Sequence, residues 1–392
     1  MRFPEFTGEW KMATFGDIAK GFDYGMNAAA KSFDGNNKYI RITDIDEVSS
    51  QYLYDDVVSP DGELEDRYLV KENDILLART GASTGKSYLY RNSDGKLYFA
   101  GFLIRANIYK HNSYFVFSQL HTLRYKKWIS VMSARSGQPG INSQEYASFP
   151  VYTTSLQEED KIATFLKLLD ERIITQNKII EKYESLIKGL NDSLYAQYGD
   201  DVLTSFSSLG FSYSGLSGKS AQDFGSGKPF ITYLNVYSNN IINEKDFQYV
   251  AIKEGEKQNV VEYGDVLFTL SSETPEEVGI GSVYLGNENV YLNSFCFGIH
   301  IINTKIAFPP YLSYYVSSTP FRKFIYPYAQ GSTRFNLCKV DFEKASIKLP
   351  SLENQKRIYS ILRHIESKTE TEKSLLDLYN SQKQYLLRQM FI

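Results

Sequence analysis

The sequence predicts an α+β protein made of two copies of one module, each a β-rich globular segment followed by a long helix. One observation is a set of motifs that occurs twice: residues 73–77 (Asn-Asp-Ile-Leu-Leu) return as 264–268 (Gly-Asp-Val-Leu-Phe), and 97–102 return as 290–295. The other is a long heptad pattern behind each set. The separation of matching positions grows from 191 to 196 residues, about half the chain. A repeat this long is a whole domain and not a solenoid unit.

The composition bounds the class of protein. A chain of 392 residues suffices for two or three domains with their own cores. No run approaches the roughly 20 apolar residues of a membrane span, and the N-terminus lacks the apolar core of a signal peptide. The only cysteines, Cys296 and Cys338, indicate neither a disulfide framework nor a cysteine zinc site. We therefore expect a cytoplasmic protein without a membrane partner, without a cofactor and without a metal.

The charge balance limits what the chain can bind alone. Its net charge is −3, and neither globular segment has a basic excess. Proteins that bind nucleic acid alone usually carry such an excess, because neutralising phosphates supplies much of the affinity. If this chain contacts DNA, a partner should supply part of the positive surface.

The first long helix is predicted to begin at Ser155, which with Glu158 has the pattern of a capping box, and to end at Gly199, a residue type that terminates helices. Between them, alternating spacings of four and three residues mark a coiled-coil seam. Its members are Ile162, Leu166, Leu169, Ile173, Gln176, Ile180, Tyr183, Ile187, Leu190 and Leu194.

The second helix repeats this pattern 196 residues later, with Ser351 as its cap. Its seam is Ile358, Leu362, Ile365, Thr369, Glu372, Leu376, Tyr379, Lys383, Leu386 and Met390. Neither stripe is satisfied alone, so we expect the two helices to pack as an antiparallel pair. The alternative is two separate surface helices, each packed on its own globule. The expected segments are 1–154 and 199–349 for the globules, and 155–198 and 350–392 for the helices.

Each globular segment reads as short strands separated by Gly, Asn and Asp turns, with one helix near its end. In the first copy we expect strands at 39–42, 74–77 and 98–102 and a helix at 114–132. In the second we expect strands at 230–234, 265–269 and 293–297 and a helix at 311–324. Gly137 with Asn142 is matched in this comparison to Gly331 with Asn336.

Candidate catalytic motifs are incomplete. Gly81–Ser87 has three residues between its glycines where a phosphate-binding loop needs four. Phe308-Pro309-Pro310-Tyr311 places Phe where an amino-methyltransferase needs Asn or Asp, so we expect a helix-entry turn. Pro60-Asp61 with Glu72 lacks the Glu-x-Lys pair of a nuclease, and the four histidines lack metal-ligand spacing. No catalytic residue is predicted.

A series of short motifs recurs in one order along the two halves, at 22–27, 39–45, 74–81, 137–142 and 156–162 in the first and at 213–216, 230–236 and 352–358 in the second. On these motifs, and over its whole length, the chain resembles the specificity subunits of type I restriction-modification enzymes. The resemblance implies two pseudo-repeated target recognition domains separated by two long antiparallel coiled-coil helices. It also implies a bipartite double-stranded DNA target, two methyltransferase (modification) subunits docked on the helices, and restriction-translocase subunits that join them. The subunit itself would read DNA without cutting or methylating it.

Candidate DNA-contacting residues are polar or basic side chains in the repeated motifs, since such groups bind phosphates and base edges. In the first domain they are Tyr24, Arg41, Thr43, Arg79, Thr80, Ser83, Lys86, Arg105, Arg135, Gln138 and Asn142. In the second they are Tyr213, Lys219, Thr232, Tyr233, Asn235, Ser271, Ser272, Asn293, Arg334 and Asn336. Each could instead shape a turn or strand surface, and Arg41 and Arg105 could form ion pairs at the edge of the core.

Three other functions stay open at this point. One is the recognition subunit of a related enzyme with fused cutting and methylating activities, which differs only in its partner. Another is a coiled-coil scaffold whose globules bind protein. The third is an undetected nuclease, which would cleave DNA alone with a metal ion.

Overall fold

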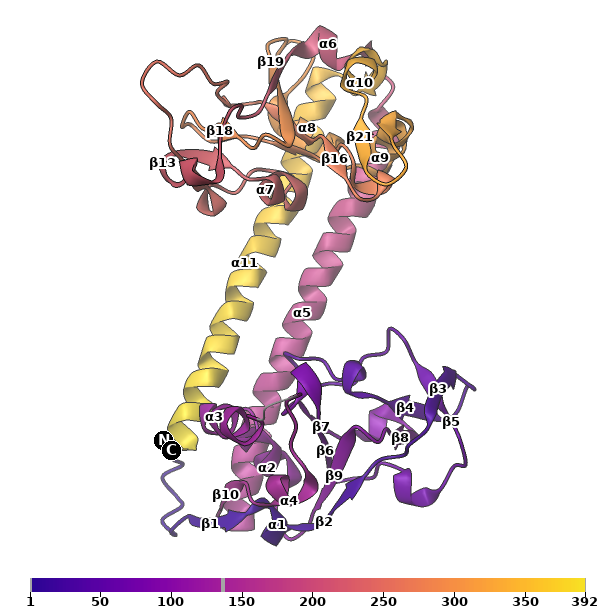
Figure 1. Cartoon of the computed structure of the whole chain (residues 1–392), viewed down its shortest axis with the longest axis vertical. Helices are drawn as coiled ribbons and strands as arrows, with labels where there is room; N and C mark the ends of the chain where they lie inside the picture. The colour runs from indigo at the N-terminus through magenta and orange to yellow at the C-terminus, as the bar shows by residue number, and fades with distance from the viewer. Residues whose placement is uncertain (1, 135–137, 392) are drawn as a thin grey trace. The chain divides into compact units, whose positions relative to one another are not determined.

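The computed structural model describes residues 2–134 and 138–391. Its contacts divide the chain into two compact units, residues up to 179 together with those from 372 onward, and residues 180–371. Each long helix contributes one part to each unit, so the units are described separately (Figure 1). The segment boundaries expected from the sequence remain a prediction.

The first unit is built on a four-stranded antiparallel sheet. Its order is β2 (Ala19–Tyr24), β9 (Leu103–Ile108), β6 (Asp74–Ala78) and β7 (Ser87–Leu89). Three two-stranded sheets join β1 (Lys11–Thr14) to β10 (Pro150–Thr153), β3 (Ala29–Ser32) to β5 (Val58–Asp61), and β4 (Lys38–Ile40) to β8 (Leu97–Phe99). The short helices are α1 (Phe15–Ile18), α2 (Ser113–Gln119), α3 (Leu123–Met132) and α4 (Ser143–Ala147). Single 3-10 turns lie at Ile42–Asp44, Asp66–Tyr68, Gly81–Ser83 and Asn92–Asp94.

The second unit repeats the same sheet order. Its strands are β12 (Gly210–Ser214), β19 (Cys296–Ile301), β15 (Val266–Thr269) and β17 (Gly281–Val283). Around them lie β11 (Val202–Thr204) with β22 (Ile347–Leu349), β14 (Gln248–Val250) with β13 (Phe224–Ile231) and β18 (Tyr291–Leu292), and β16 (Ser271–Ser272) with β21 (Phe335–Leu337) and β20 (Ala329–Gln330). The short helices are α6 (Phe206–Leu209), α7 (Tyr233–Ser238), α8 (Pro309–Tyr315), α9 (Thr319–Ile325) and α10 (Lys339–Lys344). The 3-10 turns are Ala221–Asp223, Glu244–Asp246, Pro275–Glu277 and Tyr326–Tyr328. The predicted α+β class with an internal repeat is confirmed.

The two long helices are α5 (Leu156–Tyr198) and α11 (Leu352–Met390), drawn in magenta and yellow in Figure 1. All ten seam positions of each helix are buried or half-buried. Within the first unit, Lys383 Nζ lies 2.6 Å from Asp170 Oδ1, and the Arg172 Nε–H group donates to the Tyr379 hydroxyl at 3.1 Å. The later residue of α5, Arg172, thus meets the earlier residue of α11, Tyr379. The helices are therefore antiparallel, as predicted.

Each domain core includes seam residues from both helices. Ile162, Leu166, Leu386 and Met390 belong to the first core. Ile358 and Leu362 belong to the second, against which Ile187, Leu190 and Leu194 pack. Burial of such side chains contributes roughly 1.5–3 kcal/mol each. The helices are therefore part of both cores, and the reading of two separate surface helices is wrong.

Local caps explain where the observed elements differ from the predicted ones. The helix expected at 114–132 is two helices, because the Thr122 hydroxyl accepts the Tyr125 N–H group and starts α3 anew. Ser318 starts α9 in the same way, and Phe308 is the N-cap of α8, as the helix-entry interpretation expects. The strand expected at 230–234 ends at Ile231, since Thr232 caps α7.

Glu158 does not complete the predicted capping box. Ser155 Oγ accepts the Glu158 N–H group at 3.4 Å. The carboxylate of Glu158, however, accepts two hydrogen bonds from Arg2 at 2.6 and 2.7 Å and one from the Trp10 indole at 3.1 Å. Hydrogen bonds from Arg2 and from Thr154 and Trp10 lower the pKa of Glu158 against its burial. The side chain therefore ties the N-terminal segment to α5.

Among the described residues, no helix combines the length and apolar character needed to cross a bilayer.

Candidate nucleic-acid interface

An open cavity of about 790 Å³ in the second unit brings together several residues chosen from the sequence. Tyr233 comes from α7, Ser271 and Ser272 form β16, and Arg334 precedes β21. Phe295, from the turn before β19, completes one wall. Strand pairing builds the site, because Ser271 pairs with Asn336 and Ser272 with Phe335.

Arg334 is the cation of this cavity. Its guanidinium carbon lies 5.7 Å from the centre of the Phe295 ring, and Nη2 donates to Ser271 Oγ at 3.3 Å. The side chain is exposed, and no carboxylate in the described part of the chain pairs with it. An exposed arginine without an acidic partner can bind a phosphate or the edge of a guanine. Asn336, exposed next to it, has the two-sided amide that reads adenine.

The tyrosines and the acids of the cavity hold one another in place. The Tyr233 and Tyr237 rings stack with centroids 6.1 Å apart, and the Tyr233 hydroxyl donates to the Ser271 carbonyl at 3.0 Å. Ser272 Oγ and the Tyr237 hydroxyl donate to Glu277 at 2.6 and 2.8 Å. These bonds lower the pKa of Glu277. The Ser272 hydroxyl is thus committed to Glu277, whereas the half-buried Tyr233 still lines the cavity.

The corresponding surface of the first unit contains Arg79, Tyr24 and Thr80. The guanidinium of Arg79 lies 4.9 Å from the centre of the Tyr24 ring, and its Nε is buried without a partner. The Tyr24 hydroxyl accepts the Ser143 N–H group at 3.2 Å. Hydrogen bonding from Ser143, aided by the Arg79 cation, lowers the pKa of Tyr24. Thr80 pairs with Gly140, as Ser271 pairs with Asn336.

That pairing corrects the predicted match between Asn142 and Asn336. Asn336 corresponds to Gly140 because each lies opposite the matching strand residue. Asn142 corresponds to Cys338: Asn142 is the N-cap of α4 and Cys338 is the N-cap of α10. The Asn142 side chain accepts the Glu145 N–H group at 2.9 Å, so part of its hydrogen-bonding capacity serves the helix.

Arg41 and Thr232 occupy one equivalent position, where both begin a helical turn. Arg41 donates to Asp44 at 2.7 and 2.8 Å and to Asp56 at 3.0 Å. Thr232 Oγ1 accepts the Asn235 N–H group at 3.2 Å. Asn235 is 2% exposed and bonds to the Asn243 main chain, and Thr43 donates to Asp44 at 3.1 Å. These side chains shape a turn in both domains, and we leave Arg41, Thr232 and Asn235 out of the proposed DNA surface.

Arg105, Tyr213 and Lys219 are also occupied inside the fold. Arg105 donates to Asp23 at 2.7 Å and to the Leu69 carbonyl at 3.2 Å. The Tyr213 hydroxyl donates to Asp265 at 2.6 Å; burial, together with that carboxylate, raises its pKa. Lys219 Nζ lies 2.6 Å from both Glu256 Oε1 and the Ala251 carbonyl oxygen. Their cationic and hydroxyl groups therefore support strands and loops.

The loop Gly81–Lys86 cannot wrap a phosphate in this conformation. Its main-chain donors at Gly81, Thr84, Gly85 and Lys86 bond to carbonyl groups of the protein. Lys86 is 23% exposed and lies 3.8 Å from Glu47. Ser83 is half-buried and Gln138 is exposed, and both remain candidates for contact with a ligand outside the loop. Arg135 lies outside the described residues.

Sequence reasoning missed Phe102 and Phe295. The sequence predicts strands at 98–102 and 293–297, but these two residues lie in turns before β9 and β19 and are 58% and 55% exposed. Asn293, a predicted contact residue, shapes the second of these turns, since its Oδ1 accepts the Phe295 N–H group at 2.9 Å. The match of 97–102 to 290–295 was the only signal, and it does not distinguish a buried ring from an exposed one.

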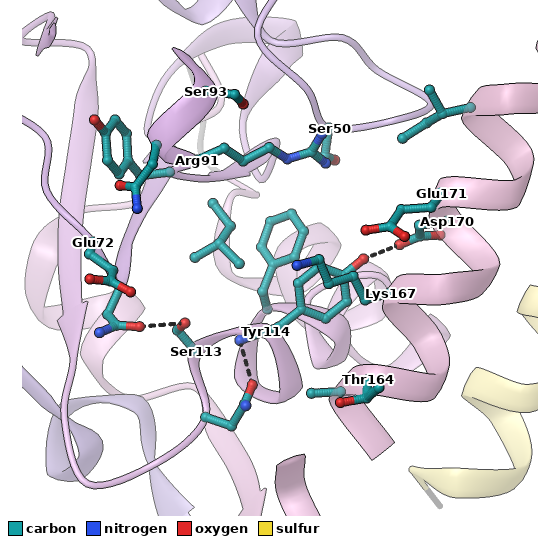
Figure 2. A pocket seen from close by; sticks show the side chains of 18 residues that line it. Ser50, Glu72, Arg91, Ser93, Ser113, Tyr114, Thr164, Lys167, Asp170 and Glu171 are labelled. Carbon is teal, nitrogen blue, oxygen red and sulfur yellow. Dashed lines mark hydrogen bonds between the residues drawn. The ribbon is translucent and has the colours of Figure 1, made fainter. Parts of the chain in front are cut away.

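A second cavity, of about 660 Å³, lies between α5 and the rest of the first unit. Figure 2 shows Arg91 extending toward Ser50, with Tyr114 against Asp170. Asp170 accepts the Tyr114 hydroxyl at 2.5 Å and pairs with Lys383, while Ser113 donates to Asn73 at 2.8 Å. None of the candidates chosen from the sequence lines this cavity. Its polar groups mainly join α5 to the domain.

No group of three or more His, Cys, Asp or Glu side chains in the described ranges is arranged to hold a metal. His111 instead contacts Glu159 at 2.8 Å and His300 contacts Asp265 at 2.8 Å.

Comparison with known proteins places this chain in a family. Residues 7–185 and 217–378 match the family model of the type I restriction modification DNA specificity domain. A type I restriction-modification S subunit from M. genitalium superposes with a TM-score of 0.58 at 15% identity, covering 98% of this chain and 96% of that one. A chain from a study of assembly and conformational transition in a type I R-M system gives a TM-score of 0.57 at 14% identity, covering 97% and 96%. At these identities the likeness of structure concerns the fold.

Proposed function

This chain belongs to the family of type I restriction-modification DNA specificity proteins, whose members are non-catalytic recognition subunits. On this basis we propose that the chain reads a bipartite double-stranded DNA target. Residues 1–154 would form one target recognition domain and residues 199–349 the other. The helices 155–198 and 350–392 would hold the two readers at a set distance.

One observation carries this proposal: the two domains share a sheet order but present different side chains from the same surface. Arg79 with Tyr24 lies there in the first domain, and Arg334 with Tyr233 in the second. A common scaffold with different polar groups suits two readers of unlike sequences, since base edges are distinguished by the pattern of donors and acceptors they meet.

The partners that fit are two methyltransferase subunits, joined by restriction-translocase subunits in the cytoplasm. Phe165 on α5 and Ile361 on α11 are repeat equivalents, 37% and 39% exposed, so each helix offers an apolar residue at the same place. The net charge of −3 supports a role for partners in DNA affinity. An exposed apolar residue at one position of each helix suits two copies of one partner.

The test is an exchange of one reader. Residues 1–150 are replaced by those of a related subunit, and the methylated sequence is determined in cells that also carry the cognate methyltransferase. We expect one half of the methylated target to change and the other to remain. A change in both halves would contradict two independent readers. Methylation that does not depend on this chain, or DNA cleavage by the purified chain with a metal ion, would contradict the proposed function itself.

A further inference from the structure

Phe102 and Phe295 are exposed rings at equivalent positions of the two domains. Phe102 is 58% exposed and Phe295 is 55% exposed, while the next residue in each turn, Leu103 or Cys296, is fully buried. The main chain fixes the equivalence: Arg79 N–H donates to the Phe102 carbonyl at 3.1 Å, and Leu270 N–H donates to the Phe295 carbonyl at 2.9 Å.

Both turns are held rigidly. In the first, Leu103 N–H donates to the Ala100 carbonyl and Gly101 N–H to the Met26 carbonyl, each at 2.8 Å. In the second, Cys296 N–H donates to the Asn293 carbonyl at 3.0 Å. The main chain that carries each ring is therefore held in place, which reduces the backbone entropy lost when the ring binds.

The fold itself gains little from these rings. Burying a Phe side chain is worth about 1.5–3 kcal/mol, and both copies forgo more than half of that gain. The two residues before each ring differ between the copies, Ala100-Gly101 against Asn293-Ser294, whereas Phe is present in both. An exposed aromatic residue kept in both copies of a divergent turn suggests a ligand contact shared by the two domains.

The surroundings favour a nucleic acid as that ligand. Arg334, which has no acidic partner among the described residues, lies over Phe295. Arg79, which carries the main-chain bond to Phe102, lies over Tyr24. Phe295 therefore has a cation against its ring, and in the first domain the cation lies on Tyr24, next to the turn that carries Phe102. Exposed rings and cations on one surface suit a polymer that offers base faces and phosphates together.

We propose that Phe102 and Phe295 are a matched pair of aromatic wedges, each of which inserts against a base step in one half of the DNA target. This inference rests on the proposed function and extends it from base-edge reading to local deformation of the duplex. Apolar side chains that enter a base step partly unstack it and bend the DNA, so sequence preference arises from how easily that step deforms.

The experiment uses the full complex with its methyltransferase and a duplex that contains the target found by methylome sequencing. 2-Aminopurine is placed in turn at positions of each half-site other than the base that the methyltransferase modifies, because its fluorescence rises when the base is unstacked and a methyltransferase flips its own target base out of the duplex. With the unaltered chain we expect a rise at one step in each half-site. F102A should remove the signal from one half-site, F295A from the other, and each should weaken binding about 10-fold to 100-fold. F102L and F295L, which keep an apolar wedge, should retain part of both effects.

F211A is the matched control, since Phe211 is 57% exposed and lies on β12, where it pairs with His300 instead of bordering the turn. It should leave fluorescence and affinity unchanged. Unaltered binding and fluorescence in F102A and F295A would overturn the wedge while leaving the two-reader function intact. Loss of methyltransferase binding, with no effect on DNA once the complex is saturated, would show that the rings contact protein. Failure of the unaltered complex to bind any bipartite target would instead contradict the proposed function.

Discussion

Gly298 lies directly opposite Tyr213 in the sheet of the second domain, and the Tyr213 ring fills the space that a side chain at Gly298 would occupy. A Cβ atom on Gly298 would lie 2.1 Å from Tyr213 Cζ. In the first domain the equivalent pair is Arg105 opposite Asp23, joined by a 2.7 Å ion pair. The two domains thus place different residues, Arg105 and Tyr213, beside an equivalent buried aspartate, Asp74 at the start of β6 and Asp265 just before β15.

Each of these aspartates is hydrogen-bonded inside its domain. Asp265 accepts the Tyr213 hydroxyl at 2.6 Å and contacts His300 Nδ1 at 2.8 Å. Asp74 accepts the Asn107 side-chain amide at 2.6 Å, and Arg105 Nη1 lies 4.0 Å away. Burial raises the pKa of both aspartates. An unpaired buried carboxylate is costly, and each aspartate has a partner on the adjacent strand, Asn107 on β9 or His300 on β19. Tyr213 reaches Asp265 from β12, across Gly298.

We predict that G298A destabilises the chain by about 2–4 kcal/mol, because the Tyr213 ring must move and its hydrogen bond to Asp265 is lost. Thermal unfolding measures the change. G189A is the control: nothing lies within 4 Å of the added Cβ, and alanine should stabilise this exposed position of α5 by about 0.5–1 kcal/mol.

The double change Y213D with G298R rebuilds the pair of the first domain and should recover part of the stability that G298R alone loses. No recovery would mean that the two pairs are not interchangeable.

The features of the two copies differ in how well they can be predicted from the sequence. Heptad spacing identifies both helices, because a seam is a property of single side chains at fixed intervals. Arg41 and Thr232 lie in motifs that match between the copies, which predicts a contact with DNA. In the structure, however, each begins a helical turn and is hydrogen-bonded to the third residue of that turn, Asp44 or Asn235, which is buried. Residues repeated between copies therefore mark the scaffold as readily as the reading surface. Phe102 and Phe295 are also repeated between the copies, but both rings are exposed while the next residue of each is buried. That difference can be seen only in the structure.

A second prediction concerns pH. Burial, together with the nearby Lys383 cation, lowers the pKa of His121 to about 4. Its ring nitrogens contact the Phe117 carbonyl and Ser50 Oγ, each at 3.0 Å, and the Asp170 carboxylate and the Lys126 cation also act on the ring. Because the folded pKa lies below the unfolded value near 6.5, the unfolded chain binds the proton more readily.

Stability from His121 should therefore be complete above about pH 6.5 and fall by up to about 1.4 kcal/mol per pH unit as the pH decreases toward 4. Urea unfolding at pH 7.5, 6, 5 and 4.5 measures this. H121N cannot take up a proton in this range, so the difference between the unaltered chain and H121N isolates the histidine from the carboxylates. A difference that stays constant with pH would show that His121 titrates normally in the fold.

A third prediction concerns the helix faces proposed for methyltransferase docking. F165D should weaken one docking site at least 10-fold and leave a complex with a single methyltransferase, since a buried charge at an apolar contact lacks a partner. I361D should do the same at the equivalent site, and the double variant should leave the chain unbound. Native mass spectrometry counts the subunits. L203D places the same charge on an apolar residue of β11 that is 70% exposed, and should leave two methyltransferases bound.

The last prediction starts from Gln176 and Glu372, which meet across the helix pair. Gln176 Nε2 donates to the Glu372 carbonyl at 3.2 Å and also to its side-chain carboxylate. The two positions are repeat equivalents in the seam, and a polar pair inside an otherwise apolar seam favours one register. Matching insertions after both residues would therefore lengthen the antiparallel helices together and keep the register on either side.

Four residues inserted at each site add about one turn, roughly 6 Å, and seven add about 10 Å. If the helix pair sets the distance between the readers, the gap between the half-sites should grow with the insertion, since B-DNA rises about 3.4 Å per base pair. The four-residue insertions should add about one or two base pairs to the gap, and the seven-residue insertions about three. Both half-sites should stay the same, because the reading surfaces are not altered. Methylome sequencing with each variant measures the gap. An unchanged gap in a complex that still methylates would show that the helices serve partner docking alone.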